Sequence, residues 1–200
     1  SNSQKVNLII QKKENKNKIL KLLKERNFKK SNVKFYKINT DRIWIRDFGP
    51  IYVKNKLNGK KAILNFKFNG WSKYNDFKLD NKINDKISKI TKIRKLEPTF
   101  KIGKKIRKFV LEGGAIDVNG MGSILLTKEC LLSKIQQRNF GIKKTDYENM
   151  LSKFLNVNNF IWLNKGIKGD DTHGHIDDIC RFVSPDTIMT AVENNKKDVN

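Results

Sequence analysis

Cysteine is scarce in this sequence, which contains only Cys130 and Cys180 among its 200 residues. The two have no CxxC spacing and no secretory context, so we predict neither a disulfide framework nor a zinc site. Unpaired cysteines fit a reducing compartment. We therefore expect a cytoplasmic protein.

Long apolar runs are also missing. No stretch of about 18 or more apolar residues occurs, which argues against a membrane-spanning helix. The first residues contain no apolar segment preceded by positive charge, as a secretion signal would, and no starting Met. The sequence predicts no membrane partner, and we expect it to be incomplete at its N-terminus.

Acidic residues are few in the first half of the chain. Residues 1–110 hold 32 Lys and Arg against 8 Asp and Glu, whereas residues 111–200 hold 11 against 12. The surplus Lys is scattered between Asn and Ile, which favours compositional drift on solvated faces over a phosphate-binding surface. We predict no nucleic-acid partner. The alternative would require one continuous basic stripe with stacking aromatic residues and salt-sensitive binding.

The remaining composition is that of a folded domain, because hydrophobic residues make up 38% of the chain. Groups of alternating strand patterns are separated by amphipathic helix patterns, which predicts an α/β or α+β fold built from repeated small units. A hairpin turn is expected at Asn58-Gly59. Helices are predicted at residues 14–28, 80–96 and 146–155, the last capped by Thr145, and extended segments at 33–38, 43–53, 62–68, 109–112, 115–118, 123–127, 160–163, 176–183 and 188–192.

Two motifs in the first half combine aromatic residues with a turn. Residues 44–50 read WIRDFGP, and this pattern places the Asp47 carboxylate at the end of a predicted strand, where loops carry function. The alternative is an ordinary structural ion pair with Arg46. Residues 68–71 read FNGW, in which an aromatic residue beside a turn is most often part of the core.

Two further motifs lie in the second half. Residues 111–114 read LEGG, where Glu112 is either a solvated acid beside a flexible turn or a carboxylate that meets a cationic substrate. Residues 170–178 read DDTHGHIDD and contain both histidines of the chain. This segment suits a metal site, a polar turn, or an acid/base histidine beside a cation-binding carboxylate, since His175 and Asp177 share one face of a predicted strand.

Together, WIRDFGP, FNGW, LEGG and THGHIDD resemble the agmatine deiminase and Porphyromonas-type peptidylarginine deiminase family, over about residues 41–193. The resemblance implies an α/β pentein fold, a propeller of ββαβ-like blades around a pseudo-fivefold axis. About three blades would fit into this length, as a single partial domain over residues 1–200. A partial fan exposes sheet edges, so we expect low stability or association into a homo-oligomer.

The resemblance also implies a mechanism and residue roles. A cysteine thiolate attacks the guanidinium carbon, ammonia leaves, and water hydrolyses the covalent intermediate, with no metal or organic cofactor. Asp47 and Asp177 would bind the guanidinium, and Glu112 would orient it or share in proton transfer. His175 would be the general acid and base, with His173 less suited. Trp44 or Trp71 would line the substrate, although core packing is the alternative for both.

The sequence departs from the family in its nucleophile. The family's cysteine lies well after the GHID histidine, so we expect this chain to stop before it, and neither Cys130 nor Cys180 suits the role. The predicted substrate is a small guanidino compound, most simply agmatine, converted to N-carbamoylputrescine and ammonia in polyamine synthesis. The alternatives are a peptidylarginine deiminase and a non-catalytic guanidinium-binding fragment.

Overall fold

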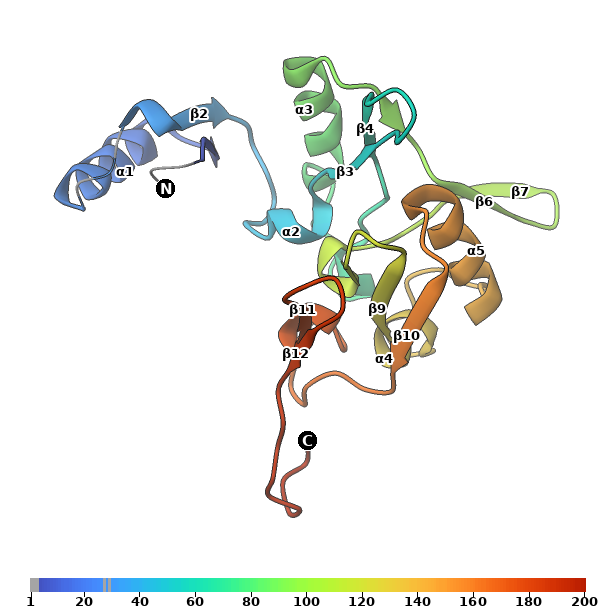
Figure 1. Ribbon diagram of the computed structural model, residues 1–200. Helices are drawn as coiled ribbons and strands as arrows, with labels where there is room; N and C mark the ends of the chain where they lie inside the picture. Colours follow the sequence, from blue (N-terminus) through green and yellow to red (C-terminus); the bar gives the residue numbers. More distant parts are fainter. Residues whose placement is uncertain (1–3, 27, 29) are drawn as a thin grey trace. The chain divides into compact units, whose positions relative to one another are not determined.

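The computed structural model describes residues 4–26, 28 and 30–200, and its helices and strands are shown in Figure 1. The chain divides into two compact units, residues 1–43 and 44–200, which are described separately. In the described part of the chain, no helix is both long and apolar enough to cross a membrane.

The first unit is a small β-α-β arrangement. Strand β1 (Val6–Ile10) and strand β2 (Val33–Lys37) pair in parallel, with helix α1 (Lys13–Glu25) and the short 3₁₀ helix η1 (Lys30–Asn32) between them. The predicted strand at residues 33–38 is confirmed. The predicted helix at 14–28 is found but ends at Glu25, and its expected end extends over position 27, outside the described residues.

The second unit contains four small sheets. The sheets have the strand orders β3-β4-β5, β6-β7, β8-β9-β10 and β11-β12, and only the β4-β5 and β9-β10 pairs are parallel. The elements are α2 (Ile45–Phe48), β3 (Ile51–Lys54), β4 (Lys61–Leu64), η2 (Gly70–Ser72), η3 (Asp80–Lys82), α3 (Ile83–Thr91), β5 (Lys95–Leu96), β6 (Thr99–Ile102), β7 (Lys105–Lys108), η4 (Gly113–Ala115), β8 (Asp117–Val118), β9 (Ser123–Thr127), α4 (Lys128–Leu132), α5 (Lys144–Leu155), β10 (Asn159–Leu163), η5 (Ile176–Asp178), β11 (Cys180–Phe182) and β12 (Ile188–Thr190).

The core of this unit lies between β4, β9 and α5. Strand β9 is buried along four consecutive residues, as expected for a strand covered on both faces. Tyr147 and Leu151 of α5 pack into the same cluster as Leu64 of β4 and Leu126 of β9. Each of the four is at most 1% exposed, so truncating any of them would cost a few kcal/mol, of the order of 2–5.

Two segments predicted as single elements contain more than one. Residues 43–53 were expected to form one strand, but residues 45–48 turn into the short helix α2, in which the Asp47 N–H donates to the Trp44 carbonyl. This turn buries Asp47 and Phe48 next to each other, which an alternating strand cannot do. The helix predicted at 80–96 ends at Thr91, because Lys92 adopts left-handed φ and Lys95–Leu96 pairs with β4.

Two predictions in the second half are wrong in detail. The strand expected at 176–183 begins only at Cys180, and residues 176–178 form the 3₁₀ helix η5 instead. The N-cap of helix α5 is Lys143 and not Thr145, and the carboxylate of Asp146, three residues on, accepts the Lys143 backbone N–H at 2.9 Å. The strands at 123–127 and 160–163 and the Asn58-Gly59 hairpin turn are confirmed. The α/β class is therefore confirmed, while the propeller of about three blades stays a prediction.

Candidate functional site

Asp47 is the central carboxylate of the site and is only 7% exposed. Its Oδ2 accepts the Trp71 indole N–H at 3.0 Å, and its Oδ1 accepts the Gly114 backbone N–H at 3.1 Å. The WIRDFGP, FNGW and LEGG motifs therefore meet at one side chain, although they are spread over about a third of the chain.

Trp71 owes its position to an unusual backbone. Its φ is 57°, the left-handed region that a bulky residue rarely adopts. The ring is 5% exposed and packs edge-on against Phe68 and Tyr74 at centroid distances of 5.0 and 6.0 Å. Such strained positions cluster at functional sites. Here the strain aims the indole N–H at Asp47.

His175 and Asp177 come to the same place from the DDTHGHIDD segment. His175 is 2% exposed, and its Nδ1 lies 3.8 Å from both Asp47 Oδ1 and Asp177 Oδ1. The prediction that His175 and Asp177 share one face of a strand is wrong, because Asp177 is in η5. The two side chains nevertheless lie next to each other. Asp170 holds the loop by accepting the backbone N–H groups of Gly174 and His175.

Gly114 is the point on which these three polar groups converge. A Cβ built on Gly114 would lie 2.5 Å from His175 Nδ1, 2.8 Å from Asp47 Oδ1 and 3.0 Å from Asp177 Oδ1. The distances are too short for any side chain. The glycine is therefore required by the close approach of the acid and base groups.

Replacement of Gly114 by Ala is expected to force Asp47, His175 and Asp177 apart and to lower the free energy of unfolding by about 3 kcal/mol, because the added methyl group would overlap all three polar groups. Urea unfolding of the variant measures the loss. Gly103→Ala is the control: this glycine has φ +56° but open space around it, so its substitution should cost only about 1–2 kcal/mol. Equal losses in the two variants would contradict the close approach at Gly114.

Glu112 lies behind this cluster, fully buried, in an ion pair with Arg138. The Arg138 Nε donates to Glu112 Oε1 at 3.0 Å, and both side chains are 0% exposed. The guanidinium also donates to the carbonyls of Gln136 and Thr172. Two buried polar atoms of the site, Glu112 Oε2 and His175 Nε2, have no hydrogen-bond partner among the described residues. Buried atoms without partners are rare and call for an explanation.

Residues 136–139 contact the segments that carry the site, and the sequence analysis did not identify them. Besides the Arg138 contacts, Asn139 donates to the Val110 carbonyl and accepts the Val110 N–H, which fixes the strand segment before Glu112. Ser72 donates to the Gln137 carbonyl, which fixes the turn that carries Trp71. An Arg-Asn pair in a polar loop gives no local signal, because the partners that connect it to the site, Glu112 and Val110, lie 26 and 29 residues away in the sequence.

The pKa of Asp47 is raised to about 6, because burial and, to a smaller extent, the Glu112 carboxylate outweigh the opposing effects of His175 and of the N–H groups of Trp71 and Gly114. Between about pH 4 and pH 6 the folded chain therefore keeps a proton that the unfolded chain releases. Stability should fall as pH rises through this window, by about 3 kcal/mol for a two-unit shift.

Urea unfolding between pH 4 and pH 7 measures this effect. The native chain should lose stability toward pH 6 more steeply than an Asp47→Asn variant, in which that titration is absent. The variant should be less stable overall at low pH, because an amide oxygen cannot accept from both Trp71 and Gly114 as the carboxyl group does. Parallel pH profiles would show that Asp47 is not the titrating group.

The other predicted residues lie in different surroundings. Trp44 is 60% exposed, so it is not packed in the core. Trp71, by contrast, is buried and packed against other aromatic side chains. His173 has φ 63°, and its Nε2 lies 3.2 Å from Ser133 Oγ, away from the carboxylate cluster.

One group of residues has the spacing of a metal site. Glu112, Cys130 and His175 each place a ligand atom within 4.8 Å of the others, and no second such group occurs among the residues that the structure describes. However, Arg138 already occupies one Glu112 oxygen, and burial strongly raises the pKa of the Cys130 thiol. Because a metal needs the thiolate, these residues do not fit a metal well.

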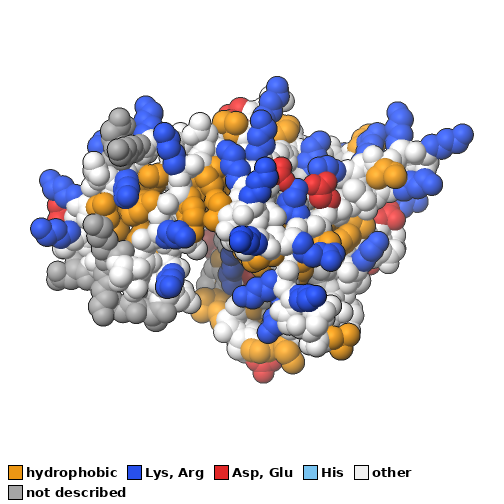
Figure 2. Space-filling view, turned by 90° about the horizontal axis from the view of Figure 1, so that it is seen from above, with side chains coloured by type: hydrophobic (Ala, Val, Ile, Leu, Met, Phe, Trp, Pro, Cys, Tyr) orange, Lys and Arg blue, Asp and Glu red, His pale blue; other side chains and the backbone are white. Residues whose placement is uncertain are grey.

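Basic residues are spread over the surface. Figure 2 shows blue Lys and Arg side chains across the visible face, separated by uncharged and apolar groups, with few red acidic ones. No single stripe stands out on this face. The interpretation of this surplus as solvated charge stays a prediction.

Known proteins are similar to this chain in sequence and in fold. The model of the Porphyromonas-type peptidyl-arginine deiminase family matches residues 1–200. The chain belongs to this family. It is 32% identical over 174 residues to the agmatine deiminase of Pseudomonas syringae pv. tomato and 34% identical over 186 residues to that of Medicago truncatula, covering 84% and 86% of this chain and 44% and 47% of theirs.

Solved structures of the family are also similar. A C. jejuni agmatine deiminase with substrate bound matches with a TM-score of 0.79 and 34% identity, over 98% of this chain and 53% of that chain. The Enterococcus faecalis agmatine deiminase matches with a TM-score of 0.77 and 27% identity, over 96% and 49%. The chain thus spans about half the length of the relatives that it matches.

Proposed function

We propose that this chain forms the guanidinium-binding and proton-transfer part of a deiminase that acts on agmatine. The observation that carries the proposal is the convergence of Asp47, Asp177 and His175 on Gly114, with Glu112 buried behind them. A guanidinium is planar, with paired N–H donors that two carboxylates can bind at once. The relatives named agmatine deiminase support agmatine as the substrate.

Asp47 and Asp177 hold the guanidinium, and the Asp47 side chain is more firmly fixed in place than that of Asp177. Asp47 is fixed by two donors, whereas the Asp177 side chain is 20% exposed and only loosely paired with Arg46 and Arg181, at 3.9 and 3.8 Å. Loose ion pairs of this kind contribute little, so a substrate guanidinium can replace them. The two arginines mark Asp177 as a position that attracts this cation.

His175 and Glu112 carry the protons. In the proposed first step, a cysteine thiolate adds to the guanidinium carbon, and His175 protonates the departing nitrogen, which leaves as ammonia. Water then adds to the amidino carbon as His175 takes one of its protons. The C–S bond breaks to release the thiolate, and the remaining hydroxyl proton passes to the released ammonia, which gives the ureido product and an ammonium ion. The unpartnered atoms Glu112 Oε2 and His175 Nε2 are the groups left available for these transfers.

Neither cysteine of this chain suits the nucleophile. Cys130 is 0% exposed and Cys180 4% exposed, and burial raises the pKa of both thiols. We propose that the thiolate comes from outside these 200 residues. The half of the family fold that is present here would then bind the substrate and supply its acid and base.

Ammonia release from agmatine by the product of the full-length gene tests the proposal, with an arginine-containing peptide as the competing substrate. Asp177→Asn should raise KM strongly, since it removes one guanidinium contact. Asp171→Asn is the matched control in the same loop, because Asp171 is exposed and contacts Lys73 and Tyr74 instead. If neither compound is turned over but agmatine still binds, the protein is a guanidinium-binding protein and not a deiminase. If agmatine does not bind either, the whole proposal is refuted.

A further inference from the structure

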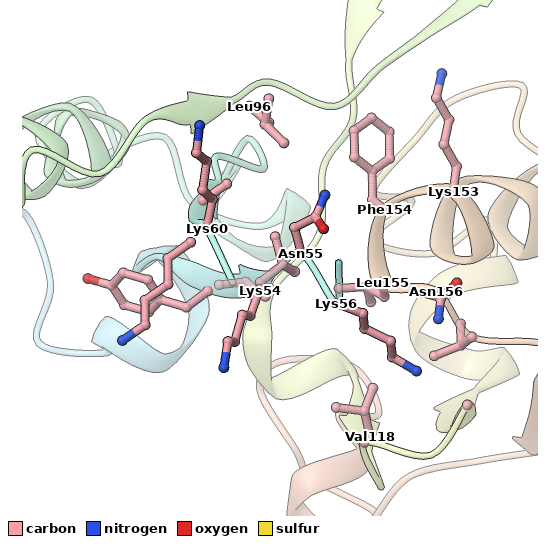
Figure 3. A pocket seen from close by; sticks show the side chains of 18 of the residues that line it. Lys54, Asn55, Lys56, Lys60, Leu96, Val118, Lys153, Phe154, Leu155 and Asn156 are labelled. Carbon is pink, nitrogen blue, oxygen red and sulfur yellow. The ribbon is translucent and has the colours of Figure 1, made fainter. Parts of the chain in front are cut away.

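A cavity of about 830 Å³ lies apart from the carboxylate cluster in the same unit. Its walls are the β3-β4 hairpin, the residue before β5, the turn after β8 and the C-terminal end of α5. Figure 3 shows hairpin residues Lys54, Lys56 and Lys60 on one side and Lys153 and Phe154 of α5 on the other. None of the residues proposed for deimination lines it.

The charge of this cavity has a single sign. No Asp or Glu lines it, and none of its basic residues forms an ion pair within the described part of the chain. Elsewhere in the unit, by contrast, Lys95 and Lys108 both pair with Glu97. The six basic lining residues are Lys54, Lys56, Lys60, Lys61, Arg94 and Lys153.

The surplus of Lys in the first half of the chain does not by itself explain this cavity. Three segments separated in the sequence supply the cations, since Arg94 and Lys153 lie outside the hairpin. Like charges gathered around one concave surface repel one another, and the concave shape focuses their potential on an anion. The C-terminal end of α5 adds only about half a negative charge, which six full positive charges outweigh.

The rest of the lining is apolar or carries amides. Ile116 and Val157 are buried at the cavity and, with Val118 and Phe154, give it an apolar wall, while Asn55, Asn58 and Asn156 supply amide groups. The size is within the range of small-molecule sites, about 300–1,000 Å³. A fitting ligand therefore combines several negative charges with an apolar or aromatic group.

We propose that this cavity binds a nucleoside triphosphate or a closely similar polyphosphate ester. The lysines of the hairpin contact the phosphates as point charges, and Arg94 can engage a phosphate through two N–H groups. The aromatic base lies against the apolar wall. This site is separate from the guanidinium site and does not depend on the function proposed for it.

Isothermal titration calorimetry with magnesium-free ATP at about 0.15 M salt tests the proposal on this chain. We expect saturable one-to-one binding, and weaker binding of tripolyphosphate, which lacks the base. Replacing Lys54, Lys56 and Lys60 together by Gln should weaken ATP binding about tenfold or more. The triple variant should fold normally, because all three side chains are exposed. Circular dichroism checks this.

A matched control removes the same charge elsewhere. Gln at Lys101, Lys104 and Lys105, exposed residues of the β6-β7 hairpin that do not line the cavity, should change the affinity by less than about twofold. Equal weakening by both triple variants would show general charge attraction and overturn the site. Absence of saturable ATP binding would also overturn it, and equal affinities for ATP and tripolyphosphate would refute the role of the apolar wall.

Discussion

Replacement of Arg138 by Met is expected to lower the free energy of unfolding by about 3–5 kcal/mol. The substitution leaves the fully buried Glu112 carboxylate without its partner, and it removes the donors to the carbonyls of Gln136 and Thr172. Losing one member of a buried ion pair is far more costly than losing a surface pair. Urea or thermal unfolding of the two proteins measures the difference.

A double-mutant cycle separates the ion pair from the loss of packing. Adding Glu112→Gln to Arg138→Met removes the stranded charge, so the double variant should regain part of the lost stability. Arg107→Met, an exposed change in β7, is the control and should stay within about 0.5 kcal/mol. A cost below about 1 kcal/mol for Arg138→Met would show that this pair does not hold Glu112.

Arg138 is an example of a site residue that could not be predicted from the sequence. The motifs that contain Asp47, Glu112 and His175 combine unusual residues within a few positions, and the structure places all three together. The Arg138 side chain reaches them only through tertiary folding, by contacts to Glu112 and to the Thr172 carbonyl. Its significance depends on burial, which no short sequence pattern encodes.

The elements predicted well are those whose pattern decides their structure. Residues 123–127 form a strand with the predicted bounds, because a continuous apolar run between turns suits a buried strand. Residues 45–48 and 176–178 lie in segments that were predicted as strands from the apolar residues around them, but they form short helical turns that place Asp47 and Asp177 in the site. These two errors fall at the site itself, where tertiary contacts override local preference.

Exchanging His175 for Asn is expected to lower kcat for agmatine by about 10²–10⁴-fold in the full-length gene product, with a much smaller change in KM. Asparagine keeps a polar side chain of similar reach beside Asp47 and Asp177, but it cannot give or take the proton. Steady-state ammonia release separates the two parameters. The expected loss is confined to kcat because the carboxylates, not the imidazole, hold the substrate.

His173→Asn is the matched control for this variant. Its left-handed φ of 63° is one that Asn tolerates better than most residues, so the fold should accept the change. Its side chain contacts Ser133 and not the carboxylate cluster, which predicts nearly native kcat. Similar losses in both variants would mean that the loop, and not the His175 imidazole, limits the rate, and the proton-transfer role would then have to move to Glu112.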